Sequence, residues 1–308
     1  LGLFWSKHQG VSGMRLFAIG LAVAFSAAGS AWAQNNPPAP KVTDMGGGIQ
    51  VIFGTGGNIA VSAGVDGVFV IDDQYANSAA ANLAKVNEIA KGAPRYLLNT
   101  HWHSDHAGGN ETFAKAGATI FAHENVRKRL TGEVASLGLD GKPAAASPAP
   151  AWPVITFHEG VDFHLNGAQI VVTKMRSSHT DGDSIVRFVE PNILHTGDIM
   201  FNGLFPVIDV GSGGSVTGYL EAMKEIYGMV DDKTRIIPGH GEIATKADLA
   251  KQIAMLEGAI KAVEARIKAK DTLEQAIAKK PLTPWKAFAW SFINEDRFTT
   301  ILYNGLKK

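Results

Sequence analysis

Residues 101–106 read HWHSDH, which places three histidines and one aspartate within six positions. The motif directly follows an apolar segment whose composition predicts a β-strand, so it would lie on the loop at that strand's end. Side chains two residues apart in extended chain point the same way, so His101 and His103 can bind one metal ion. A turn after His103 would direct Asp105 and His106 towards a second ion. Clustered histidine and carboxylate side chains are typical zinc ligands, and this stretch therefore predicts a metal site.

Three further candidate ligands, His179, Asp198 and His240, occupy the same kind of position along the chain. Each lies beside the end of a predicted strand and among small residues, as a metal cleft at one edge of a layered fold requires. The chain contains no cysteine, which excludes thiolate ligands, disulfides and a cysteine nucleophile. Any metal must therefore be bound by nitrogen and oxygen.

The hydrophobic pattern around these ligands predicts two halves, each a β-sheet followed by helices. In the first half, strands are predicted at 49–53, 59–63, 68–71, 96–99 and 119–122, with helices at 77–91, 111–115 and 124–130. In the second half, strands are predicted at 154–157, 169–174, 184–188, 192–194 and 235–237, with helices at 219–229 and 245–270 and helical turns over 283–306. Two such halves pack sheet on sheet with their helices outside, so the expected fold is α/β, a four-layer αββα sandwich.

The N-terminal sequence has the pattern of an export signal. Arg15 precedes an apolar run at 16–28, and residues 31–33, Ala-Trp-Ala, form a small-x-small cleavage site. We therefore predict an export signal over 1–33, with translation starting at Met14. The apolar run is too short for a membrane span, so the expected location is periplasmic or secreted, with no stable membrane insertion after cleavage.

A flexible leader over 34–45, rich in proline and asparagine, is expected to precede a single catalytic domain over 46–308. The formal net charge is zero, with 29 basic and 29 acidic residues, which argues against a nucleic-acid partner. The expected partner is a small-molecule substrate. Nothing in the sequence determines the oligomeric state.

In order and spacing, the ligands resemble those of the metallo-β-lactamase superfamily: an HxHxDH motif, then His, then Asp or Cys, then His. The resemblance covers roughly residues 41–308 and implies two zinc ions per chain. It implies that one zinc is bound by His101, His103 and His179, and the other by Asp105, His106 and His240. Asp198 is similar to the carboxylate that bridges both metals in glyoxalase II and many other hydrolases of the superfamily.

The resemblance implies hydrolysis of an amide or ester bond by metal-bound hydroxide, with Asp105 as the catalytic residue that orients it. Substrates of the β-lactam or lactone type fit this chemistry. However, many acquired β-lactamases have Cys where this chain has Asp198, followed by a lysine that is missing here. A glyoxalase II-like thioester hydrolase is therefore one alternative. An iron-dependent oxidoreductase on the same fold is another, although the complete second ligand set weighs against it.

Several other residues are expected to support the site. Asp72 is predicted to orient a ligand, and His195 to be structural. Asp181 or Asp183 either holds a ligand imidazole or forms a turn. Three loops are expected to shape the substrate cleft: 53–58, which resembles the mobile flap of the family, 131–152 and 202–217.

Overall fold

The computed structural model describes residues 40–137 and 142–307. The predicted export signal and most of the predicted leader lie outside these residues. The strand β1 (Lys41–Gly46) falls within the predicted leader, yet its Met45 is buried in the core between the sheets. The folded part therefore begins before residue 46. No helix within the described ranges is long and apolar enough to cross a membrane.

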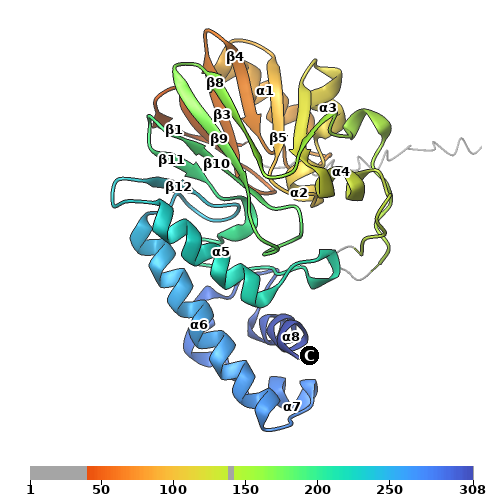
Figure 1. Cartoon of the computed structure of the whole chain (residues 1–308), viewed down its shortest axis with the longest axis vertical. Helices are drawn as coiled ribbons and strands as arrows, with labels where there is room; N and C mark the ends of the chain where they lie inside the picture. The colour runs from red at the N-terminus through yellow and green to blue at the C-terminus, as the bar shows by residue number, and fades with distance from the viewer. Residues whose placement is uncertain (1–39, 138–141, 308) are drawn as a thin grey trace, which may run out of the picture. The chain divides into compact units, whose positions relative to one another are not determined.

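Two β-sheets form the centre of the fold (Figure 1). The first sheet has seven strands in sequence order: β1, β2 (Ile49–Phe53), β3 (Ile59–Gly64), β4 (Gly67–Ile71), β5 (Pro94–Asn99), β6 (Thr119–His123) and β7 (Ile155–Phe157). The second has five, in the order β12 (Arg235–Ile237), β11 (Ile193–His195), β10 (Ser184–Phe188), β9 (Ala168–Lys174) and β8 (Gly160–Leu165). Apolar side chains from the inner faces of both sheets form one continuous core.

Helices cover the outer face of each sheet, which completes the predicted four-layer αββα sandwich (Figure 1). The first sheet is covered by α1 (Ala79–Ala90) and α3 (Asn110–Lys115), and the second by α5 (Val216–Met229) and α6 (Lys246–Lys268), against which α8 (Glu295–Leu306) packs. The remaining helices are α2 (Ser104–Ala107), α4 (Glu124–Leu130) and α7 (Leu273–Ala278), with 3-10 turns η1 (Ala149–Ala151), η2 (Gly197–Ile199), η3 (Val210–Ser212) and η4 (Thr283–Phe288). Most of these elements lie within a few residues of their predicted positions.

Besides β1 and the four-residue helix α2, two further elements were not predicted because their sequence patterns are weak. β8 is an edge strand whose side chains alternate between exposed and half-buried, so it lacks a fully buried apolar face. The helix α7 has six residues, shorter than the window that reveals helical periodicity.

The parallel strand pairs determine where the functional loops lie. β4 pairs with β5 in the first sheet and β11 with β12 in the second, both in parallel. The carboxyl ends of parallel strands meet at one edge of a sheet, and ligand-binding loops commonly follow them. The HWHSDH motif follows β5, Asp198 follows β11, and His240 follows β12.

Candidate metal centre

The structure brings all seven predicted ligands together in two adjacent groups. The first group is His101, His103, His179 and Asp198, and the second is Asp105, His106 and His240. Within each group, one ligand atom from every residue lies within 4.8 Å of the others. For the six other residues this is the partition that the resemblance implied, whereas Asp198, expected to bridge both metals, groups with the first three histidines.

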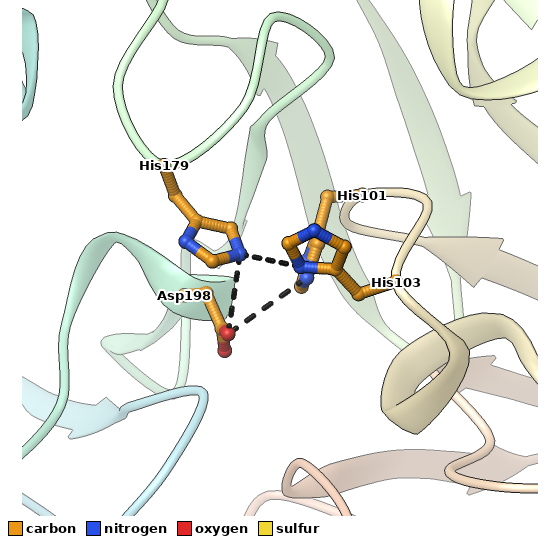
Figure 2. Close-up of side chains that lie close together, drawn as sticks. All are labelled: His101, His103, His179 and Asp198. Atoms are coloured by element: carbon orange, nitrogen blue, oxygen red, sulfur yellow. Dashed lines mark hydrogen bonds and ion pairs between the residues drawn. The ribbon is translucent and has the colours of Figure 1, made fainter. Parts of the chain in front are cut away.

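In the first group, two imidazole nitrogens face each other at close range (Figure 2). Nδ1 of His103 lies 2.8 Å from Nε2 of His179. The other ring nitrogen of His103 donates to Oδ2 of Asp209 at 2.9 Å, and that of His179 donates to the Val207 carbonyl at 2.8 Å. These acceptors assign the ring protons to the outer nitrogens, so the two facing nitrogens carry lone pairs. A cation between them satisfies both.

His101 likewise has one ring nitrogen hydrogen-bonded away from the group and the other directed into it. The Thr100 hydroxyl donates to Oδ2 of Asp72 at 2.8 Å, so it accepts from Nδ1 of His101, 3.0 Å away. Nε2 of His101 is buried and has no hydrogen-bond partner among the described residues. Burial also lowers the pKa of the imidazole well below its usual value, as do the neighbouring histidines, so the ring is neutral. A buried lone pair directed into a cluster of other ligand atoms fits a bound metal ion.

The second group contains a carboxylate of its own and is less buried. Nε2 of His106 lies 3.3 Å from Nε2 of His240, and Oδ2 of Asp105 lies 3.2 Å from the same His240 atom. Nδ1 of His106 contacts Oδ2 of Asp72 at 2.7 Å, which directs Nε2 towards the other ligands. Burial alone would lower the pKa of His240, but Asp198 and Asp105 raise it to about 9. The same negative charge favours a divalent cation.

Asp198 lies between the two groups. Its Oδ2 is 3.4 Å from Nε2 of His179 and 3.8 Å from that of His101. Its Oδ1 is 3.0 Å from Nε2 of His106. Although burial alone would raise the pKa of this carboxyl, His106 and other nearby imidazoles hold it well below its usual value, so the group is ionised.

Gly239 allows this close approach. A methyl group at that position would lie 2.0 Å from Oδ1 of Asp198, well inside van der Waals contact. The predicted ligands stand among small residues, and at position 239 a small residue is needed because a larger one would collide with Asp198.

The residues that hydrogen-bond to the candidate ligands from outside the two groups, here called the outer partners, confirm some predictions and correct others. Asp72 orients His106 directly and His101 through Thr100, as predicted. His195 is buried and structural, with Nε2 donating to the Asn58 carbonyl at 3.0 Å.

Neither acidic residue after His179 holds a ligand imidazole. Asp183 accepts from the Thr180 amide, forming the alternative turn. Asp181 instead forms a two-bond ion pair with Arg129 of α4, at 2.6 and 3.0 Å. The outer partner that the sequence did not predict is Asp209, an isolated aspartate in a loop, with no motif to relate it to His103.

The hairpin over 53–58 is hydrogen-bonded to both ligand-bearing loops, which does not fit the expected mobile flap. The Gly57 amide donates to the Asp105 carbonyl at 2.9 Å, and the Asn58 amide donates to the Gly239 carbonyl at 2.8 Å. Gly57 also lies directly against the His106 ring, since a methyl group there would be 2.1 Å from Cε1. The hairpin therefore fixes the distance between the loop that carries Asp105 and His106 and the loop that carries His240.

A cleft of about 750 Å³ opens onto this centre. Its lining includes five of the candidate ligands, His103, Asp105, His179, Asp198 and His240. Its walls come from all three loops expected to shape it, and also from the C-terminal segment after η4, which was not expected to contribute. The volume suits a small organic molecule.

Fold and site together define a metal-dependent hydrolase. Residues 53–240 match the model of the metallo-beta-lactamase superfamily, and the chain belongs to that superfamily.

Comparisons with individual proteins agree with this assignment. An uncharacterised protein of Mycobacterium tuberculosis is 25% identical over 209 residues, covering 65% of this chain and 91% of its own length. A hydroxyacylglutathione hydrolase of Gloeobacter violaceus is also 25% identical, over 57% of this chain and 61% of its own length. Among solved structures, a metallo-beta-lactamase from Pontibacter korlensis has a TM-score of 0.58 at 17% identity, covering 71% of this chain and 99% of its own. The sec-alkylsulfatase Pisa1 from Pseudomonas sp. has a TM-score of 0.61 at 17% identity, covering 86% of this chain and 50% of its own.

Proposed function

We propose that this protein is an exported dinuclear zinc hydrolase that cleaves amide or ester bonds, with β-lactam- or lactone-type substrates. The observation that carries the proposal is the placement of Asp198, whose Oδ2 faces the first ligand group while Oδ1 faces the second. A carboxylate shared in this way suits two cations held side by side. Nitrogen and oxygen ligands dominated by histidine suit zinc.

Bound zinc ions would polarise the substrate carbonyl and lower the pKa of a bound water towards about 7. The chain's own part in the reaction centres on Asp105. Its side chain is 17% exposed and lines the cleft, and nearby His106 and His240 lower its pKa to about 2 despite burial. We assign Asp105 to orienting the attacking water and passing its proton to the leaving group. Because water is the nucleophile, no acyl-enzyme forms.

The test is a substrate panel on the zinc-loaded protein, containing a β-lactam, a lactone, a thioester and a phosphodiester. We expect hydrolysis of the lactam or the lactone, and its loss on chelation and in Asp105→Ala. The exposed Asp232, in the turn after α5, provides a matched control for that substitution. Undiminished hydrolysis after exhaustive chelation would overturn the proposal. Elemental analysis of protein made without added metal separates zinc from the iron expected of an oxidoreductase.

A second candidate, thioester hydrolysis, is favoured by two specific observations. One is the match to the hydroxyacylglutathione hydrolase of Gloeobacter violaceus. The other is the carboxylate of Asp198 at the shared position. A hydroxyacylglutathione thioester in the same panel distinguishes the two functions, since preferential cleavage of that substrate would replace the lactam and lactone proposal.

The export part of the proposal rests on the pattern over residues 1–33. We expect the mature protein to be recovered outside the cytoplasm with an N-terminus near Gln34. N-terminal sequencing tests this directly, and a mature chain that retains residues before Met14 would contradict it.

A further inference from the structure

The two walls of the cleft differ in chemistry. One wall includes Trp102, whose ring centroid lies 5.1 Å from that of His103, and otherwise consists mainly of small or aliphatic side chains: Ala107, Leu130, Ala144 and Ala145. Arg129 also lines this wall, but its charge is balanced by the ion pair with Asp181. Beside the second group lie Phe201, Trp290 and Phe292, here called the aromatic wall, and Arg297, which packs on Phe292, also lines the cleft there.

The aromatic wall is continuous with a metal ligand. The Phe201 ring stacks on His240, with centroids 4.9 Å apart and planes inclined by 15°. Trp290 lies 6.0 Å from His240 and 6.2 Å from Phe201, and Phe292 follows at 5.6 Å from Trp290. An apolar group placed along these rings would therefore begin at the second metal position and extend outwards.

Polar contacts hold the outer rings in place. Nε1 of Trp290 donates to the Phe205 carbonyl at 3.0 Å. The Arg297 guanidinium lies over the Phe292 ring at 4.0 Å, and its Nη1 donates to the Phe292 carbonyl at 2.9 Å. Even so, Phe292 is 38% exposed. A large aromatic ring that is fixed in a cleft and left partly exposed is a surface prepared for an apolar ligand group.

We propose that the aromatic wall binds an alkyl or aryl arm of the substrate, attached near the reacting carbonyl. This inference rests on the proposed function, because it places that arm relative to the metal centre. Binding beside His240 would direct the arm away from the small-residue wall. Trp290 and Phe292 would therefore determine specificity.

The test uses γ-lactones that differ only in alkyl arm, from γ-butyrolactone to γ-decalactone, on the zinc-loaded full chain. Each CH2 buried against the wall should raise kcat/KM by roughly threefold to fourfold until the wall is filled. Phe292→Ala and Trp290→Ala should flatten this dependence, because kcat/KM should fall more for γ-decalactone than for γ-butyrolactone. Tyr227→Ala is the matched control, since Tyr227 is an aromatic residue of 39% exposure on α5, outside the cleft lining.

Calorimetric titration of butyrate and decanoate separates this inference from the proposed function. Tighter binding of decanoate that is lost in Phe292→Ala, without cleavage of any lactone, would support the subsite while removing lactone hydrolysis. Equal binding of butyrate and decanoate would overturn the subsite, as would a chain-length dependence that is the same in Phe292→Ala and Tyr227→Ala. Trp290→Ala removes a partly buried ring, so the unfolding temperature of that variant is measured alongside its kinetics. If Trp290→Ala fails to fold, the result for Phe292→Ala decides the test.

Discussion

The two ligand groups differ in how they are enclosed. In the first, His101, His103 and His179 are at most 5% exposed, and the outer nitrogen of each ring donates to a fixed acceptor. In the second, the side chains of Asp105 and His240 are 17% and 15% exposed in the cleft lining. A preformed set of imidazoles loses little entropy on binding a cation, whereas the more accessible Asp105 carboxylate of the second group can also meet substrate. We therefore expect the first group to bind its metal more tightly and the second to lie closer to the substrate.

Removing the shared carboxylate should produce the largest effect, because both groups lose a ligand at once. In Asp198→Ala, we expect metal content to fall below two ions per chain. The loss of kcat/KM should exceed the roughly 10–100-fold typical of an outer partner. Elemental analysis and kinetics measure the two effects, with Asp232→Ala as control. Full metal content in Asp198→Ala would remove Asp198 from both groups.

A smaller but still severe effect is expected from Gly239→Ala, whose methyl group would displace Oδ1 of Asp198 from the second group. Overpacking of this kind costs about 1–3 kcal/mol of stability, and the second metal should be lost preferentially. Denaturant unfolding and metal analysis test this. Gly228→Ala in α5 is the matched control, because a methyl group there meets nothing within 4 Å and should stabilise the helix by up to about 1 kcal/mol. If both variants behaved alike, the steric argument would fail.

Substituting the carboxylates that hydrogen-bond to the ligand histidines, Asp209 and Asp72, should affect the two metal-binding groups differently. Asp209→Asn should weaken the tighter metal by about 10–100-fold and leave the weaker one unchanged, because the Asp209 side chain hydrogen-bonds to His103, and the Asp209 amide to the His179 carbonyl, both in the first group. Asp72→Asn should weaken both metals, since Asp72 contacts His106 directly and reaches His101 through Thr100. Competition with a chromophoric chelator measures both constants. Equal weakening of the two metals by Asp209→Asn would contradict the assignment.

The smallest expected effect is the difference between the two metals in the unaltered protein. With increasing chelator, the second metal should leave first, at about tenfold lower chelator concentration, a difference of about 1.4 kcal/mol in binding. Activity should fall with that first release. Loss of both metals in a single step would show that the difference in enclosure has no effect on affinity.

The clustering of the seven candidate ligands could be predicted from the sequence because metal binding restricts both residue type and position. Histidine and aspartate clustered at strand ends seldom serve packing alone, and the αββα layers follow from regular apolar patterns. Asp209 and the hydrogen-bonded hairpin could not be predicted in the same way, because each depends on contacts between distant loops. The aromatic wall depends on the C-terminal segment turning back over the cleft, which local periodicity does not encode.

Each ligand group joins segments that are far apart in the chain, so a bound metal would link the two halves of the fold. His103 and His179 are 76 residues apart, and His106 and His240 are 134 residues apart, with one member of each pair beside each sheet. A bound cation is therefore a removable cross-link between the two halves, contributing about 4 kcal/mol when free metal exceeds its Kd a thousandfold. If the chain crosses a membrane unfolded, the metal concentration on the far side would determine how much this cross-link stabilises the folded protein. Maturation would then follow metal availability rather than synthesis.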